Sequence, residues 1–285
     1  MMFVSTGLSY SSRLLSAASA LALMAAAMPA SQAHAADEFT GVYAISLVGL
    51  SLGTATIKGQ LGPDAYKIEA FAKLSGLAQA MSGARGSAAA SGLVRGGQVA
   101  PNAYATTSTN SKETRTVRMG LNAGTVRAVD IQPAPTLGPG RVNITEAHKR
   151  GVVDPLSALV MPVPGSGPVL SAAACNRSIP VFDGFARFNV QLSFAGMRNV
   201  ATQGYKGQVV VCNARYVPIA GHRPDRKSTK FMADNKKMEV WLAPVNSSRY
   251  LVPYRISVAT MIGMTVIEAR RFDVRNDPGT ASVRR

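Results

Sequence analysis

Histidine, the side chain most suited to acid–base chemistry near neutral pH, is scarce in this sequence. His34 lies in an N-terminal segment that we expect to be removed, which leaves only His148 and His222. A Ser-His-Asp arrangement would therefore have to use one of these two. Neither has a partner at metal-ligand spacing, and there is no H-E-x-x-H motif, so we predict no metal site.

The segment Gly49–Gly53 (GLSLG) matches the G-x-S-x-G pattern of hydrolases. A nucleophile elbow needs a strand before the serine and a helix after it. Here Thr54–Lys58 continues as an alternating strand, which favours a hairpin turn. No phosphate-binding or dinucleotide-binding motif occurs, so we expect no cofactor. We assign no catalytic residue and favour a protein that is not an enzyme. An envelope hydrolase that uses His148 or His222 remains an alternative.

The residue types most able to bind a ligand lie in the C-terminal half. The basic segment His222–Lys230, followed by Lys236 and Lys237, is the strongest local concentration of charge. It lacks interleaved aromatic residues, so base stacking is not indicated and we expect no nucleic-acid partner. The candidate ligand-binding residues are Asp183, Arg187, His222, Arg223, Trp241 and Arg255.

Most of these candidates also have a structural explanation. Asp183 is of a type that caps turns, and it could form an ordinary ion pair with Arg187. Trp241 is of a type that is commonly buried in a core. The segment His222–Lys230 could be a solvated loop.

The N-terminus has the pattern of a secretory signal peptide. Arg13 precedes an apolar run over Leu14–Met28, and Ala33–Ala35 (AHA) fits the small-residue cleavage rule. We therefore expect residues 1–36 to be a signal peptide and the mature protein to be periplasmic. An uncleaved membrane anchor is the alternative.

Charge and cysteine content fit such a compartment. The formal net charge is +16, which favours anionic partners such as acidic lipid or an envelope polymer. The two cysteines, Cys175 and Cys212, are expected to form one disulfide in an oxidising compartment. Two free thiols are the alternative.

The apolar residues alternate with a period of two, which is typical of half-buried antiparallel strands. Phe188, Val190, Leu192 and Phe194 show it most clearly. Short helices are expected at Leu77–Met81 and at Asp154–Val160. We predict a mainly β single domain over 37–275, with two halves divided near 133–150 as an alternative, and a flexible basic tail over 276–285. The expected strands are 39–48, 52–60, 65–74, 87–95, 100–109, 114–122, 125–132, 186–195, 207–217, 237–244, 250–260 and 264–274.

An ordered series of short motifs resembles the bacterial exported proteins grouped as domain of unknown function 3108. The series comprises Gly49–Gly53, Asp154–Ala158, Cys175, Val181–Gly184 leading to Arg187, Cys212 with Tyr216–Gly221, Val240–Pro244 and Val252–Ser257. It covers nearly the whole mature chain. The chain is also similar, more loosely, to the periplasmic lipoprotein-carrier fold, which implies a large curved antiparallel sheet or open barrel whose concave face holds acyl chains under short helices.

These expectations favour a non-catalytic binding protein for an apolar or amphipathic envelope ligand, with lipid or an anionic polymer as possible partners. Peripheral contact with a membrane is compatible with the charge. The alternative to a carrier is a structural envelope protein that contacts anionic cell-wall or lipopolysaccharide polymer. Neither the ligand nor the oligomeric state follows from the sequence.

Overall fold

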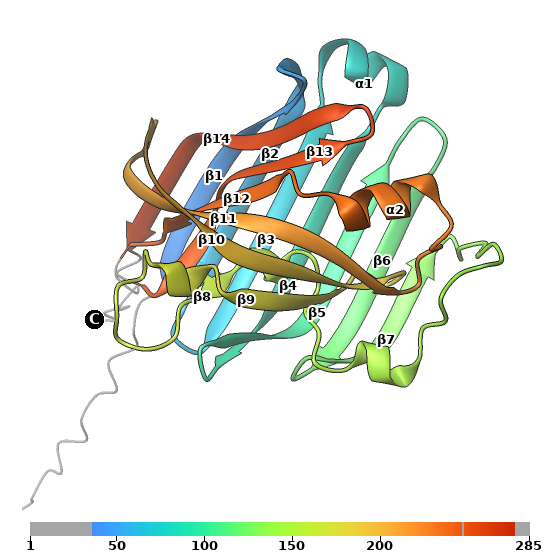
Figure 1. Ribbon diagram of the computed structural model, residues 1–285, viewed down its shortest axis with the longest axis horizontal. Helices are drawn as coiled ribbons and strands as arrows, with labels where there is room; N and C mark the ends of the chain where they lie inside the picture. Colours follow the sequence, from blue (N-terminus) through green and yellow to red (C-terminus); the bar gives the residue numbers. More distant parts are fainter. Residues whose placement is uncertain (1–35, 247, 277–285) are drawn as a thin grey trace, which may run out of the picture. The chain divides into compact units, whose positions relative to one another are not determined.

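A computed structural model describes residues 36–246 and 248–276 (Figure 1). The expected signal peptide and basic tail therefore lie outside the described residues, except for Ala36 and Asn276. The strands and helices are β1 (Asp37–Leu47), β2 (Leu50–Leu61), β3 (Ala65–Leu74), α1 (Gly76–Ser82), β4 (Arg85–Arg95), β5 (Gln98–Thr109), β6 (Thr114–Asn122), β7 (Thr125–Gln132), β8 (Met161–Pro162), β9 (Arg177–Phe182), β10 (Arg187–Thr202), β11 (Tyr205–Ala220), α2 (Lys227–Asp234), β12 (Met238–Pro244), β13 (Tyr250–Thr260) and β14 (Gly263–Asn276).

The strands form one antiparallel sheet in the order β7-β6-β5-β4-β3-β2-β1-β14-β13-β12-β11-β10-β9, with β8 paired to β13. Neighbours in this order are mostly consecutive in sequence, joined by short turns or, between β3 and β4 and between β11 and β12, by the helices α1 and α2. The exception is the β1–β14 pair, which joins the two ends of the described chain. The sheet does not close, since β7 and β9 remain its two edges. The expected mainly β fold with a large curved sheet is confirmed.

Alternation of apolar and polar residues determines which face of each strand is buried. In β3, Tyr66 and Ile68 are buried, whereas Lys67 and Glu69 between them are exposed. Strand β11 differs, because Val209–Cys212 are all buried. It is covered on both faces, as expected for a strand in the middle of a layered structure.

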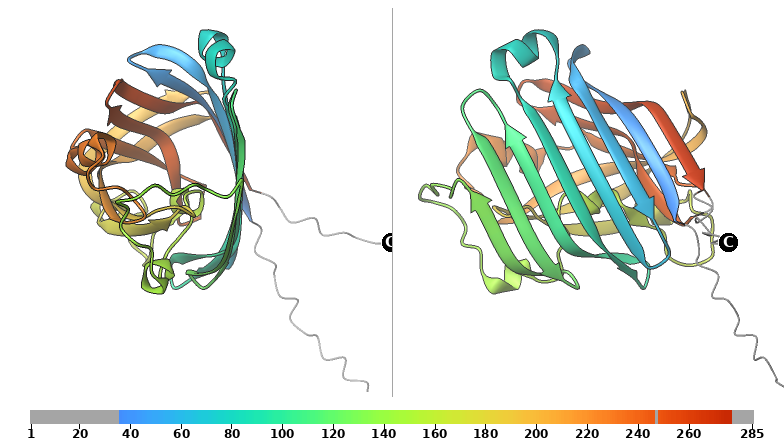
Figure 2. Two further views of the ribbon diagram at one scale, coloured as in Figure 1. Left: turned by 90° about the vertical axis from the view of Figure 1, so that its right-hand side faces the viewer. Right: turned by 180° about the vertical axis from the view of Figure 1, so that it is seen from behind.

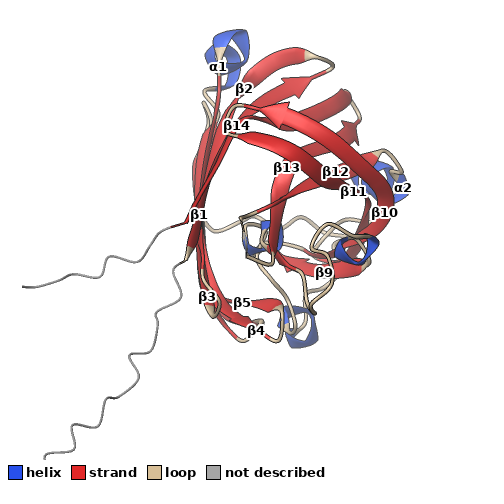
Figure 3. Cartoon of the chain, turned by 90° about the vertical axis from the view of Figure 1, so that its left-hand side faces the viewer, coloured by secondary structure: helices blue, strands red, loops and turns tan. Residues whose placement is uncertain are grey.

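The sheet curls so that its two halves face each other (Figures 2 and 3). Strands β1 to β7 form a wall, and β10 to β13 cross its concave face. The tip of the β10–β11 hairpin returns to β14, where the Thr202 hydroxyl donates to the carbonyl of Arg270 (2.5 Å). Beside this contact, the rings of Phe39, Tyr205, Tyr254 and Phe272 pack together.

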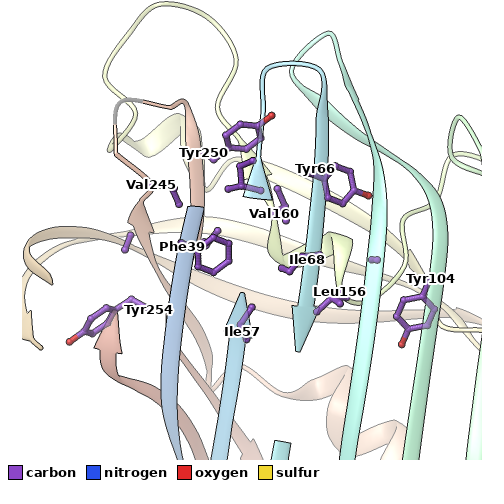
Figure 4. Close-up of a cluster of buried hydrophobic side chains, with 14 of the residues drawn as sticks. Phe39, Ile57, Tyr66, Ile68, Tyr104, Leu156, Val160, Val245, Tyr250 and Tyr254 are labelled. Carbon is purple, nitrogen blue, oxygen red and sulfur yellow. The ribbon is translucent and has the colours of Figure 1, made fainter. Parts of the chain in front are cut away.

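The segment between β7 and β9 fills the space under the curved sheet (Figure 4). Leu156 and Val160 belong to the same buried cluster as Ile68 and Tyr104 of the wall and Tyr250 of the opposite half. The backbone of this segment also bridges the sheet edges. The amide of Val152 donates to the carbonyl of Gly124 (2.8 Å), and that of Val153 donates to Pro180 of β9 (2.8 Å).

A second buried cluster lies on the other face of the C-terminal strands. It contains Met161, Val163 and Ala174 from the later part of the segment between β7 and β9, together with Val210 and Leu242 from the sheet. Cys175 and Cys212 form a disulfide, with Cα atoms 5.4 Å apart, that attaches this segment to β11. The expected cysteine pair is present.

All the strands expected from alternation are present, and α1 confirms the helix expected at Leu77–Met81. Three expectations need correction. The helix expected at Asp154–Val160 is only a 3-10 turn over Ser157–Leu159. The basic segment 222–230 is not a continuous loop, because α2 begins at Lys227. Strand β9 was not expected, since Pro180 interrupts its pattern, although an edge strand tolerates proline. Within the described residues, no helix is long and apolar enough to cross a membrane.

Candidate ligand-binding site

A short buried network fixes the segment that fills the sheet. One carboxylate oxygen of Asp154 accepts the backbone N–H groups of Leu156 (3.0 Å) and Ser157 (2.8 Å), which turns the chain. The Ser157 hydroxyl donates to the other oxygen of Asp154 (2.5 Å) and lies 2.6 Å from the hydroxyl of Tyr66. The network therefore attaches this turn to β3.

The ionisation of this network reflects its burial. Asp154 is completely buried, and burial raises the pKa of its carboxyl group. Hydrogen bonds from the Ser157 side chain and from the backbone oppose this shift. Burial also raises the pKa of the Tyr66 hydroxyl. Both groups are satisfied by internal partners, which is the pattern of a structural network.

Beside this turn lies an open pocket of about 630 Å³, at the end of the sheet where the β4–β5 and β6–β7 turns meet. We call it the end pocket. Its volume falls within the range of small-molecule sites. Most of its lining is apolar or backbone, and it comprises Arg95, Gly97–Ala100, Ala123, Gly124, Gly151–Val153, Ala158, Val160–Pro164, Ala173 and Asn176–Pro180.

One wall of this pocket is formed where the backbone of Gly151–Val153 approaches the β6–β7 turn at Gly124. Gly124 has a φ of 75°, a conformation that favours glycine, and a Cβ atom there would lie 3.4 Å from the carbonyl oxygen of Val152. The segment between β7 and β9 can therefore approach the β6–β7 turn closely, because no side chain lies between the two backbones at Gly124.

The charged residues of the end pocket are basic. None of the lining residues is acidic, and two are arginines. Arg95 is exposed, whereas Arg177 is partly buried and donates to the carbonyl of Pro162 (3.1 Å). Burial lowers the pKa of Arg177, although a guanidinium stays charged at physiological pH. An apolar pocket with two cations suits an anionic, amphipathic ligand.

A second hollow of about 620 Å³ adjoins the end pocket across Pro162–Pro164. It is lined partly by Leu61, Val94 and Tyr250. Arg249 holds the dividing loop, because its guanidinium donates to the carbonyls of Val163 (2.9 Å) and Gly167 (2.9 Å). This arginine is thus engaged within the protein.

None of the candidate residues expected from the sequence lines the end pocket. Asp183 caps a turn, since its carboxylate accepts the amides of Phe185 (2.8 Å) and Ala186 (2.7 Å). Burial raises its pKa, and these hydrogen bonds oppose the shift. Arg187 donates to Phe188 (2.5 Å) and Asn189 (2.7 Å) instead. The ion pair considered between Asp183 and Arg187 is therefore absent from the described residues.

The other four candidates form two separate groups. Trp241 and Arg255 are cross-strand neighbours, and the guanidinium lies 4.9 Å from the indole ring centre. Arg255 also pairs with Glu268 of β14 (3.2 Å). These cross-strand contacts link β12, β13 and β14 and stabilise the sheet. His222 and Arg223 follow β11, and Arg223 pairs with Asp225 (3.1 Å).

The two histidines lie in different settings. The ring of His148 accepts the amide of Thr145 (3.1 Å) and thereby closes a short 3-10 turn. The Nδ1 atom of His222 is buried and has no hydrogen-bond partner among the described residues. Over residues 36–246 and 248–276, neither histidine forms an ion pair with a carboxylate, and no cluster of His, Cys, Asp or Glu could hold a metal ion.

Comparison with known proteins gives a family but no activity. No curated protein matches the sequence. One solved structure, described as a β-barrel-like protein of domain of unknown function DUF1849 from Brucella abortus, is similar with a TM-score of 0.48 and 10% identity, over 85% of this chain and 98% of that one. The family DUF3108, described as a protein of unknown function, matches residues 42–270. The match spans nearly all of the described strands, and the chain therefore belongs to the DUF3108 family.

Proposed function

We propose that this protein is an exported, non-catalytic binding protein whose end pocket takes an anionic amphipathic ligand. Such a ligand has an acyl chain and a carboxylate or phosphate head group. The observation that carries the proposal is the apolar pocket of about 630 Å³ that contains two arginines and no acidic residue. An acyl chain would bury apolar surface against the partly exposed Val99 and Ile179, at roughly 25 cal/mol per Å².

The end pocket is not the space under the concave face of the sheet, where the likeness to the lipoprotein-carrier fold would place an acyl chain. Much of that space is occupied by Leu156, Val160 and their neighbours in the buried cluster. The end pocket instead lies where the filling segment meets the turns at the end of the sheet, so it opens to solvent. A ligand could enter there without displacing the core.

Export is the second part of the proposal. The N-terminal pattern of Arg13, the apolar run and Ala33–Ala35 supports it, and so does a disulfide that would be rare in a reducing compartment. Intact mass measurement of protein released from the periplasm tests this part. A mass that lacks the first 35 or 36 residues is expected, whereas a full-length mass in the membrane fraction would contradict it.

Mass spectrometry of an organic extract tests the ligand directly. The protein is purified from the periplasm without detergent, and a stoichiometric anionic lipid or fatty acid is the expected result. Titration with a dansyl-labelled fatty acid then locates the site. Ala158→Phe fills the pocket and Arg95→Gln removes its exposed cation, so each should weaken binding by about tenfold.

Arg127→Gln is the matched control, because Arg127 is an exposed arginine of β7 that does not line the pocket. Thermal unfolding of each variant shows whether the fold is retained. If folded wild-type protein carries no lipid and does not bind the probe, the proposal is wrong. Salt-sensitive binding to cell-wall or lipopolysaccharide polymer by such an empty protein would then favour the structural alternative.

A further inference from the structure

Large apolar side chains are exposed at the opposite end of the sheet from the end pocket. Leu77 and Met81 of α1 are each 83% exposed, and Ile262 in the β13–β14 turn is 76% exposed. The complete set, which we call the apolar tip, is Val48, Leu50, Leu77, Met81, Met261, Ile262 and Met264. Single exposed apolar residues are ordinary, but a group of this size at one end of a molecule is not.

The antiparallel topology brings these residues together. Alternate turns of a meander lie at the same end, so the β1–β2 turn, α1 and the β5–β6 turn project together. The β13–β14 turn joins them because Leu47 pairs with Thr265. Figures 1 and 2 show α1 and the β1–β2 turn side by side at one end of the sheet.

Backbone hydrogen bonds connect the turns that carry the tip. The amide of Val48 donates to the carbonyl of Met264 (2.8 Å). The amide of Ser75, which precedes α1, donates to Leu52 of β2 (2.8 Å). At the other end of α1, the amide of Ser111 in the β5–β6 turn donates to Ser82 (2.8 Å). The apolar tip is therefore a fixed part of the fold.

Basic residues surround the tip. Lys73, Arg85 and Lys112 are exposed at the ends of the strands that support it. Lys236 and Lys237 lie close to the β13–β14 turn, since the amide of Ala259 donates to the carbonyl of Lys237 (2.9 Å). The turns that carry the tip contain one acidic residue, Glu113, which pairs with Arg115 (2.6 Å), and the segment of Lys236 and Lys237 adds the exposed Asp234.

We propose that the apolar tip docks this protein on the surface of an anionic phospholipid bilayer. Apolar side chains on projecting turns can enter the interface between head groups and acyl chains, while the surrounding lysine and arginine residues contact the head groups. Charge complementarity favours a bilayer over a second copy of this chain. In a symmetric dimer through the tip, these basic residues would face one another.

Vesicle flotation with the full-length mature protein tests this inference. The probes are vesicles of phosphatidylglycerol with phosphatidylethanolamine, and vesicles of phosphatidylcholine alone. Binding is expected to the anionic vesicles, and it should weaken as salt is added. The double variant Leu77→Ser/Met81→Ser should lower the partition coefficient by about tenfold or more, because both side chains lose their apolar contact with lipid.

Leu137→Ser is the matched control, because Leu137 is 57% exposed in the loop after β7 and does not belong to the tip. It should bind vesicles as the wild type does. Ile262→Ser provides an independent variant on another turn, should the helix variant misfold. The inference is overturned if wild-type protein does not float with anionic vesicles at low salt, or if the folded tip variants float as well as Leu137→Ser. A stable dimer in sedimentation that the tip variants abolish would also overturn it, in favour of self-association.

Discussion

At the scale of single residues, the buried hydrogen bonds among Asp154, Ser157 and Tyr66 hold the filling turn against the wall of the sheet. Asp154 satisfies two backbone amides and one hydroxyl group. A buried donor that loses its partner costs about 1–3 kcal/mol. The same network positions the turn that lines the end pocket, so it links stability to the candidate site.

Replacing Asp154 by alanine should therefore lower the free energy of unfolding by about 2–4 kcal/mol, since it removes a cap and leaves several buried donors without acceptors. Urea unfolding followed by circular dichroism measures this change. Asp130→Ala is the control, because Asp130 forms an exposed ion pair with Arg118 and its loss should have little effect. Equal stability losses in the two variants would contradict the assigned role.

The raised pKa of Asp154 predicts a pH dependence of known sign. In the unfolded chain this carboxyl loses its proton near its ordinary value of 3.8, whereas the folded state retains the proton to a higher pH. As pH rises from the unfolded towards the folded pKa, this group therefore makes the folded state less stable. The stability of wild type relative to Asp154→Asn should fall as pH is raised from about 4 to about 7. Urea unfolding of both proteins across this range measures it, and a relative stability that rises would contradict it.

At the scale of elements, close approaches between neighbouring hairpins depend on glycine. Gly204, with a φ of 84°, lies in the turn between β10 and β11 that returns to β14. A Cβ atom there would lie 2.7 Å from the carbonyl oxygen of Phe272. Gly204→Ala should lower the free energy of unfolding by about 1–3 kcal/mol, because the backbone is strained and β14 must shift. Gly138→Ala is the control, since no atom lies within 4 Å of its Cβ position. Thermal unfolding that leaves both variants equally stable would show that the hairpin tip does not press on β14.

The disulfide attaches the segment Met161–Ala174, which covers the outer face of β11, to that strand. Cys175 and Cys212 are 37 residues apart in the sequence. In the chain-entropy model, closing such a loop stabilises the folded state by about 4 kcal/mol. Cys175→Ala/Cys212→Ala should lose a large part of this stability and become sensitive to proteolysis over Met161–Ala174. Limited proteolysis with mass spectrometry measures this, and an unchanged cleavage pattern would contradict it.

Most elements could be predicted from the sequence because each has a strong local pattern. The wall strands alternate cleanly, as Tyr66 to Glu69 illustrate. Strand β9 could not be predicted, although it pairs with the next strand in the sequence, β10, because Pro180 disrupts its pattern. The end pocket was also missed, since it is assembled from turn backbones and residues of the segment between β7 and β9. The charged candidates Asp183 and Arg255 attracted attention by type, yet the structure engages them in a turn cap and an ion pair.

At the scale of the whole molecule, the central question is whether the two halves divided near residues 133–150 are independent. The main buried cluster draws Tyr66 and Tyr104 from one half and Tyr250 and Phe272 from the other. Strand β14 pairs with both β1 and β13, so it belongs to both halves. Neither half can bury its apolar face without the other, which argues for one cooperative unit.

Differential scanning calorimetry of the mature protein should therefore show a single transition whose calorimetric and van't Hoff enthalpies agree. A fragment that ends after β7 should fail to fold alone, because its concave face would expose Ile57, Tyr66 and Ile68 to water. The control is a mixture of this fragment with the complementary C-terminal fragment, which should regain structure if the shared core drives folding.

Two separate transitions, or a fragment with dispersed amide resonances on its own, would mean that the halves are distinct domains. The end pocket would then lie at a domain boundary and could change shape as the halves move, whereas a single transition means that its shape is fixed by the core.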